Sequence, residues 1–363
     1  MSNVLIIGGG IIGLLTAREL CAAGADVTLL ERGELARESS WAGGGILSPL
    51  YPWRYPDSIT RLVSWSQQTY AELCEDLYEN TGIDPEYLQN GLLIEASGER
   101  SRALHWSAMH RHLLLPVNAD RIAEMEPEHK QPPEAAIWMP GIAQVRNPRL
   151  ARALAQDAVQ RGVHIRTQTP ALNLKISNNR ILGITTAAGK FSATTVVLCA
   201  GAWTGELSQI LPTPVDIRPV RGQMLLFKGK PDTIHHMMLE ENRYIIPRKD
   251  GRILFGSTLE EAGFDKSTTK AARMELEQLA IQRFPVLKDF PVEQHWAGLR
   301  PAAPAGIPYI ARHPQIDNLF INAGHYRNGV VLGPASARLL GDLLLHRKPI
   351  VDPAPYTMDA ARG

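Results

Sequence analysis

The first thirty residues alternate between short apolar runs and one helical stretch. Residues 4–7 and 27–30 are largely apolar, and residues 11–23 carry apolar side chains at helical spacing up to a glycine at position 24. Apolar runs of this length are typical of strands buried on both faces of a parallel sheet, and a helix between two of them completes a βαβ unit. The pattern therefore predicts an α/β domain from the first residues onward.

Three later segments return to this pattern. A helix is predicted over residues 150–162 and a strand over 163–166. A buried parallel-type strand over 195–204 ends in Ala200-Gly201-Ala202, and a strand at 318–323 leads through a Gly-rich turn into a helix over 334–345. Strands of this kind add to the parallel sheet that the first βαβ unit begins.

The segments between these parts of the chain contain mainly hairpin and meander strands. Strands are predicted over 222–227, 244–248 and 252–257, with a hairpin turn at 249–251, and a meander over 171–176, 180–184 and 190–193. Helices are predicted over 53–77 and 270–284. We expect an α/β fold in which a discontinuous cofactor domain (1–80, 146–219 and 300–363) is interleaved with a β-rich α+β substrate domain (81–145 and 220–299).

The turn after the first strand carries the most specific motif. Gly8-x-Gly10-x-x-Gly13 joins strand to helix, and Glu31 ends the second strand. In such a turn the first glycine permits the tight bend, the second lets a pyrophosphate approach the backbone, and the third lets helix and strand pack closely. The helix N-terminus faces the anion, and an acid at the position of Glu31 accepts hydrogen bonds from a ribose. The context predicts a Rossmann-like dinucleotide site.

A second loop of small residues favours FAD over NAD. It follows Arg32 closely and reads Ser39-Ser40-Trp41-Ala42-Gly43-Gly44-Gly45-Ile46. FAD is longer than NAD and carries a rigid tricyclic ring that the protein must cover, and glycines bring backbone close to a ring. The turn at 324–329 is followed by a helix N-terminus, which favours the negative charge of a reduced flavin.

Composition excludes several other classes. The 363 residues include 38 basic and 37 acidic side chains, for a formal net charge of +1, so no bulk charge favours nucleic acid or an anionic membrane. Cys21, Cys74 and Cys199 show neither CxxC nor metal-ligand spacing, which favours buried thiols in a reducing compartment. Neither a cleavable leader nor an apolar run of about 18 residues is recognised, so we expect a cytoplasmic protein with no metal.

Taken together, the motifs resemble the D-amino-acid-oxidase/glycine-oxidase family of flavoproteins over essentially the whole chain, and most closely its thiamine-biosynthesis type. The most specific are Gly298-Leu299-Arg300-Pro301 and the run from Gly324 to Gly329, Gly-His-Tyr-Arg-Asn-Gly. The resemblance implies a GR2-type FAD domain and a homotetramer. From the motifs and the resemblance we expect FAD to contact Gly8, Gly10, Ile11, Ile12, Gly13, Glu31, Arg32, Ser39, Ser40, Gly44, Gly45, Ile46, Ala171, Ala200, Gly201, Trp203, His325, Tyr326, Arg327, Asn328, Gly329, Val330 and Val331.

The resemblance also implies the substrate contacts and the reaction. Arg300 is expected to bind a substrate carboxylate, Tyr244 to hydrogen-bond it, and Arg327 to border the site. The implied reaction is hydride transfer from a small amine (glycine, sarcosine or a small D-amino acid) to flavin N5, with O2 reoxidising the flavin to give hydrogen peroxide. Bulky Tyr244, Leu259 and Tyr326 are expected to restrict substrate size. Because residues 293–333 contain no cysteine, FAD is expected to bind noncovalently.

Three alternatives stay open from sequence. A D-amino-acid or sarcosine dehydrogenase passes electrons to another carrier and shares these motifs. The oxidative module of a tRNA-modifying enzyme acts on a glycine-like side chain, although the near-neutral charge argues against it. An FAD-binding scaffold without turnover is the third.

Overall fold

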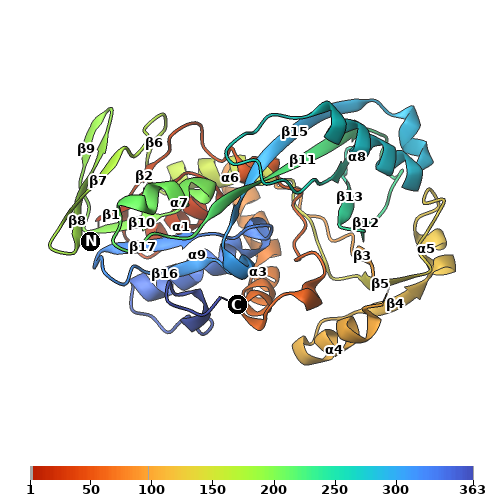
Figure 1. Ribbon diagram of the computed structural model, residues 1–363, viewed down its shortest axis with the longest axis horizontal. Coiled ribbons are helices and arrows are strands. Elements are labelled where there is room, and N and C mark those ends of the chain that lie inside the picture. The colour runs from red at the N-terminus through yellow and green to blue at the C-terminus, as the bar shows by residue number, and fades with distance from the viewer. Residues whose placement is uncertain (1–2, 97, 363) are drawn as a thin grey trace.

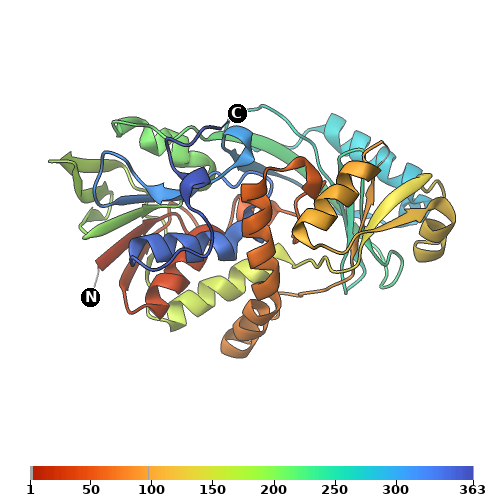
Figure 2. The same cartoon turned by 90° about the horizontal axis from the view of Figure 1, so that it is seen from below.

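Two β-sheets lie side by side in the computed structural model, which describes residues 3–96 and 98–362 (Figure 1). One sheet has six strands and the other eight, and a small three-stranded sheet lies at the far edge of the first. The long helix α3 (Asp57–Thr81) runs through the middle of the molecule, as Figure 2 shows from below. The two large sheets therefore form separate halves that share one central helix.

The six-stranded sheet contains the predicted βαβ unit. Its strand order is β16-β17-β10-β1-β2-β6, and every neighbouring pair is parallel except β16 with β17. The apolar side chains of its strands and of the helices α1, α3, α6 and α9 form one large core. The bounds are β1 (Asn3–Ile7), α1 (Ile11–Ala22), β2 (Asp26–Leu30), α6 (Asn147–Gln160), β6 (His164–Arg166), β10 (Thr195–Leu198), β16 (Tyr309–Arg312), β17 (Leu319–Ala323) and α9 (Gly329–Leu344).

The eight-stranded sheet has the order β15-β11-β14-β13-β12-β3-β5-β4. Helix α8 (Lys270–Arg283) packs on one face against Phe227 and Phe255, while the other face carries Met224, Tyr244 and Ile246. The bounds are β3 (Leu92–Glu95), α4 (Arg100–His110), β4 (Leu115–Asn118), α5 (Ala119–Met125), β5 (Ala135–Met139), β11 (Arg218–Lys228), β12 (Met237–Glu240), β13 (Arg243–Pro247), β14 (Arg252–Gly256) and β15 (Val292–Ala302).

The two halves are joined by long strands rather than by a hinge segment. β11 and β15 pair antiparallel from Arg218–Ala302 to Phe227–Val292, and the expected boundaries at 219/220 and 299/300 both fall inside them. The small sheet is formed by β7 (Asn173–Ser177), β8 (Arg180–Thr186) and β9 (Gly189–Phe191). Short helical segments complete the chain: α2 (Ser39–Ala42), α7 (Thr204–Leu207), and the 3-10 turns η1 (Pro52–Arg54), η2 (Gly201–Trp203), η3 (Ser208–Ile210), η4 (Pro285–Asp289), η5 (Pro304–Gly306) and η6 (Ala354–Tyr356).

Several predicted boundaries were wrong, among them the following three. The strand expected over 195–204 ends at Leu198, because Gly201 has a φ of +55° and begins the 3-10 turn η2. The helix expected from residue 53 begins at Asp57, behind the separate turn η1. The last helix begins at Gly329 rather than at Pro334, which lies inside it.

Helix α9 accommodates Pro334 through two buried side chains of α3. A proline has no N–H to donate to the carbonyl four residues earlier, here that of Val330. The Tyr70 hydroxyl donates to this carbonyl at 2.8 Å, and Ser66 Oγ accepts from the amide of Ala335 at 3.0 Å. The side chains of Tyr70 and Ser66 are fully buried. The proline defect is therefore repaired by tertiary contacts.

Replacing Tyr70 by phenylalanine is expected to destabilise the protein by about 1–3 kcal/mol, because the Val330 carbonyl loses its partner in a buried place. Urea unfolding of the variant measures this loss. Tyr78 lies on the same helix and is 55% exposed, so Tyr78→Phe is the matched control and should change the free energy of unfolding little. Equal stabilities for Tyr70→Phe and wild type would show that the hydroxyl does not compensate the proline.

Candidate functional site

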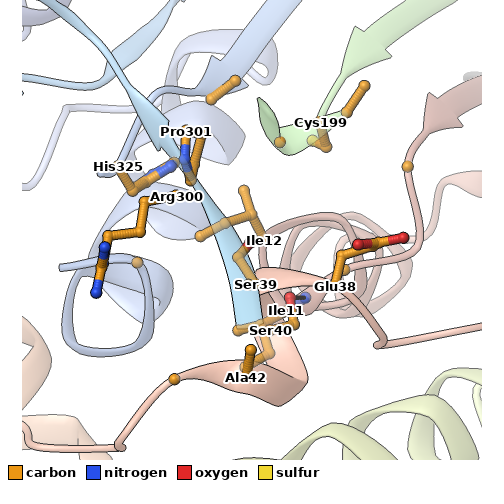
Figure 3. Close-up of a pocket in the computed structure, with 18 of the residues that line it drawn as sticks. Ile11, Ile12, Glu38, Ser39, Ser40, Ala42, Cys199, Arg300, Pro301 and His325 are labelled. Carbon is orange, nitrogen blue, oxygen red and sulfur yellow. Dashed lines mark hydrogen bonds between the residues drawn. The ribbon is translucent and has the colours of Figure 1, made fainter. Parts of the chain in front are cut away.

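A large pocket lies between the two sheets. Its wall is formed by the ends of β1, β2, β10 and β17, by α2 with the glycines that follow it, and by β11, β13 and β15. In Figure 3, Arg300 and Glu38 lie at opposite sides of the view, with Ile11 and Ile12 between them. The pocket therefore extends from the Gly-rich turn of the six-stranded sheet to the floor of the eight-stranded sheet.

The Gly-rich turn has the geometry that its sequence requires. Gly8 has a φ of +112°, and a Cβ there would lie 2.4 Å from the carbonyl oxygen of Cys199. A Cβ on Gly13 would lie 1.9 Å from the oxygen of Gly8, so this glycine sets how closely α1 packs on the strand end. Gly10 caps α1 without a side-chain hydrogen bond, which leaves the helix N-terminus facing the pocket. This turn has the geometry with which dinucleotide-binding sites hold a pyrophosphate.

Glu31 is fixed at the edge of the pocket by backbone amides. Its Oε2 accepts from the amide of Gly9 at 2.7 Å, and its Oε1 accepts from the amide of Gly33 at 2.8 Å. A carboxylate oxygen has two lone pairs, so each oxygen keeps one for another donor. The carboxylate is thus preset to accept hydrogen bonds from ribose hydroxyls.

The segment after Glu31 closes this end of the pocket. Ser40 Oγ accepts from the amide of Ile11 at 2.9 Å and so ties α2 to the start of α1. The Arg32 guanidinium lies 3.4 Å from the ring centroid of Trp203, a cation–π contact. Glu38 accepts from Arg32 at 2.9 Å and from Lys266 at 2.9 Å. Residues from α2, from η2, from the segment between β2 and α2 and from the segment before α8 thus meet here.

Arg300 lies at the other end of the pocket, which the eight-stranded sheet forms. Its guanidinium donates to Ser257 Oγ at 2.6 Å and to the carbonyls of Arg221 and Thr258 at 3.1 and 3.3 Å. Among the described residues it has no carboxylate partner within ion-pair distance. Loss of solvation lowers the pKa of Arg300, and the Tyr244 hydroxyl and the Arg327 charge act on it in opposite directions. A cation held this way is a receptor for a carboxylate, which can form two parallel hydrogen bonds with guanidinium.

Gly222 makes room for this guanidinium. A Cβ on Gly222 would lie 2.1–2.4 Å from atoms of the Arg300 guanidinium. Gly222 pairs with Gly298 across β11 and β15, and a Cβ on Gly298 would lie 2.5 Å from that of Ala42. A glycine inside a strand often marks a close approach of another group. This facing pair of strand glycines is therefore a signal of the site that was present in the sequence and went unrecognised there.

Almost all of the predicted site residues line the pocket. Tyr244, Arg300 and Arg327 do, and so do all of the predicted cofactor contacts except Gly13 and Asn328. Gly13 does not line the pocket, but it lets α1 pack closely on the end of β1. Asn328 is the buried N-cap residue of α9. Leu259 was misplaced, because its side chain is 58% exposed and does not line the pocket. Lining residues that were not predicted as contacts include Leu50, Thr169, Pro170, Met224, Ser257 and Pro301.

The two histidines near the predicted site differ in position. His325 is buried in the pocket wall, its Nε2 lies 3.0 Å from Ser336 Oγ, and burial lowers its pKa to about 3. His295 lies on β15, and burial lowers its pKa as well. Its side chain does not line the pocket. His325 is therefore already the neutral imidazole at neutral pH, and it is a weak base that takes up a proton only in strong acid.

His325→Ala is therefore expected to leave the shape of the pH profile of kcat/KM for an amine substrate unchanged. The depressed pKa keeps His325 neutral above about pH 4 in the folded protein, so the histidine does not titrate where amines lose their proton. In both proteins kcat/KM should rise toward alkaline pH, since this parameter reports ionisations of free enzyme and free substrate. A rise that disappears only in the variant would make His325 the base.

Metal-binding clusters and membrane-spanning helices are both absent from the described residues. No group of three or more His, Cys, Asp or Glu side chains is arranged to hold a metal ion among residues 3–96 and 98–362. None of the helices in these ranges is long and apolar enough to cross a membrane. The three cysteines are free thiols.

Comparison with known proteins connects this geometry to a family. The family model of FAD dependent oxidoreductases (DAO) matches residues 3–343. The glycine oxidase of Pseudomonas aeruginosa is 47% identical over 98% of both chains. A crystal structure of glycine oxidase from Geobacillus kaustophilus superposes with a TM-score of 0.94 at 28% identity, over all of both chains. The bifunctional protein ThiO/ThiG of a Nostoc species is 32% identical over 95% of this chain and 53% of its own length. The chain belongs to the DAO family of FAD-dependent oxidoreductases.

Proposed function

We propose that this protein oxidatively deaminates glycine and other small amines, such as sarcosine and small D-amino acids, with FAD as cofactor and O2 as electron acceptor. The observation that carries the proposal is the pocket itself, which has the Gly-rich turn at one end and the Arg300 guanidinium at the other. That guanidinium has no carboxylate partner among the described residues. The 47% identity to a full-length glycine oxidase supports the choice of substrate. The products are the oxoacid, ammonia or an amine, and hydrogen peroxide.

The residues present fit FAD. Gly8 and Gly10 leave room for a pyrophosphate, and Glu31 keeps free lone pairs for a ribose. Residues 293–333 contain no cysteine, so we propose noncovalent binding. Bound flavin supplies the acceptor for a hydride from the α-carbon of the substrate. We propose the same cofactor-contacting residues as above, and the same division into a discontinuous FAD domain and a substrate domain.

The protein side chains orient the substrate rather than react with it. We propose that Arg300 binds the carboxylate through its fork and that the hydroxyl of Tyr244, which lines the same pocket, donates to the same group. Arg327 borders the pocket and adds positive charge that favours an anionic substrate. His325 is neutral and is not proposed as the base, so the substrate ammonium loses its proton to solvent. The lone pair of the free amine then drives departure of the α-hydrogen as a hydride.

A panel of amines under air tests this function. Glycine and sarcosine should consume oxygen and release one peroxide for each amine oxidised, and D-alanine should react more slowly. D-phenylalanine should react least, because the bulky side chains of Tyr244 and Tyr326 line the pocket. Turnover only with an added electron carrier and no peroxide would instead make the protein a dehydrogenase. Faster turnover of D-phenylalanine than of glycine would contradict the proposed pocket size. A cytoplasmic homotetramer, and a place in thiamine biosynthesis, stay predictions.

A further inference from the structure

A second arginine near the pocket is buried without a carboxylate partner. Arg248 follows β13, is 6% exposed, and forms no ion pair with any residue in the described part of the chain. Its Nη1 donates to Gln144 Oε1 at 2.5 Å and to the carbonyl of Val145 at 3.0 Å, and its Nη2 donates to the carbonyl of Gly44 at 2.7 Å. Burying a charge without a counter-charge costs folding free energy.

The acceptor of Nη2 belongs to the loop of glycines that lines the pocket. A Cβ on Gly44 would lie 2.7 Å from Ile246 and 3.2 Å from the Tyr244 ring, so this glycine lies directly against the substrate end. Gly45 has a φ of +82°, and a Cβ there would lie 2.0 Å from the carbonyl oxygen of Val145. The loop is thus confined between the pocket on one side and the segment at Val145 with Arg248 on the other.

The direction of the Gly44 carbonyl decides where the next amide points. The peptide between Gly44 and Gly45 is trans, so its C=O and N–H point in opposite directions. The carbonyl points at Arg248, and the N–H of Gly45 therefore points away from Arg248. This N–H has no acceptor among residues 3–96 and 98–362, although the Gly45 carbonyl accepts from Val145 at 2.9 Å. Gly45 itself lines the pocket.

We propose that Arg248 is a positioning residue that holds the peptide between Gly44 and Gly45 so that the Gly45 N–H is presented to the flavin as a hydrogen-bond donor. This inference rests on the proposed function for its ligand. A charged donor on the carbonyl also polarises the peptide and strengthens the N–H on its other side. Both effects favour the negative charge that a flavin gains on reduction.

The charge on Arg248 persists at physiological pH. Burial and the neighbouring Arg146 lower its pKa to about 10, which still leaves it protonated near neutrality. The charge is retained where it interacts with a backbone carbonyl, and no carboxylate neutralises it within ion-pair distance in the described chain. An uncharged side chain of similar length removes both the anchor and the charge.

Arg248→Met tests the proposal, with Arg252→Met as matched control. Arg252 lies on the same hairpin but pairs with Glu293 at 2.7 Å and Asp250 at 2.9 Å, so its guanidinium is held away from the glycine loop. Hydrogen exchange of the protein as purified, followed in a peptide spanning residues 43–47, should be about tenfold faster in Arg248→Met and unchanged in Arg252→Met. This readout needs no substrate and no turnover.

The flavin readouts follow on the same proteins. In Arg248→Met the reduction equilibrium of bound FAD should shift about tenfold toward the oxidised form, and kcat should fall while the KM for glycine stays within about twofold. Arg248→Lys keeps the charge in nearly the same volume and should recover part of each effect, which covers the case in which the methionine variant does not fold.

The outcomes separate the two proposals. A wild-type protein that binds no FAD would overturn the proposed function, whereas unchanged exchange at residues 43–47 in Arg248→Met would overturn the role of Arg248 alone. An unchanged reduction equilibrium together with faster exchange would show that Arg248 holds the loop without acting on the flavin, and would also contradict the proposal. A rise in the KM for glycine with an unchanged kcat in Arg248→Met would also contradict the role proposed for Arg248.

Discussion

Arg300→Ala is expected to raise the KM for glycine by about two to three orders of magnitude while FAD content stays at the wild-type level. The substitution removes a charge-assisted, two-point contact to the substrate carboxylate, and truncating one partner of such a pair costs roughly 2–5 kcal/mol. The guanidinium touches Ser257 and two carbonyls, none of which can replace its charge. Steady-state kinetics with glycine, together with flavin absorbance of the purified variant, measures both quantities.

Two further variants separate the charge from the geometry. Arg300→Lys should recover only part of the affinity, because an ammonium lacks the planar fork. Gly222→Ala leaves the arginine in the chain but places a Cβ 2.1–2.4 Å from its guanidinium atoms, so it should also raise KM by displacing the fork. A near-normal KM in Arg300→Ala would show that the carboxylate binds elsewhere.

Gly13→Ala is expected to abolish FAD binding and to destabilise the protein by more than about 3 kcal/mol, a cost typical of severe overpacking. The new Cβ would lie 1.9 Å from the carbonyl oxygen of Gly8. Gly13 lies inside α1 and Gly8 directly follows β1, so neither backbone segment can shift freely. Relief of the overlap requires α1 to move away from the strand end, which removes the helix N-terminus from the pyrophosphate site. Flavin content and thermal unfolding report the two losses.

Gly141→Ala is the control for this substitution. A Cβ on Gly141 meets no other atom within 4 Å, and its φ is not in the left-handed region, so its alanine variant should fold and bind FAD normally. A Gly13→Ala protein that retains bound FAD would show that the close packing of α1 on β1 is not required.

The half of the molecule with the six-stranded sheet was predictable because its sequence signals are local. The turn at Gly8, Gly10 and Gly13 depends on backbone geometry that few other residues permit, and β1, β2 and β10 are largely apolar and largely buried. Arg300 and Tyr244 were named only through the resemblance, since a charged or aromatic strand residue carries no local sign of its partner. The structure then placed both in one pocket with the dinucleotide turn.

The remainder depends on contacts between distant segments. Strands β3, β4 and β5 extend the eight-stranded sheet, but each has only four or five residues and β4 is largely exposed, so no periodic pattern marks them. Pro334 suggested a helix start, because proline favours the first turn, and only Tyr70 and Ser66, more than 250 residues away, explain why α9 begins earlier. Arg248 ends the predicted strand 244–248, and its acceptors at Gly44 and Val145 are about 200 and 100 residues away in the chain, so no local pattern indicates its contacts.

Anaerobic mixing of the oxidised protein with glycine shows whether one pocket brings flavin and amino acid together. If the pocket holds FAD at one end and binds a small amino acid through Arg300 at the other, the flavin absorbance should bleach in a single turnover, at a rate that saturates with glycine concentration. Arg300→Ala should bleach far more slowly at the same concentration. A protein that carries FAD and stays yellow with glycine, sarcosine and D-alanine would refute the proposed amine oxidation.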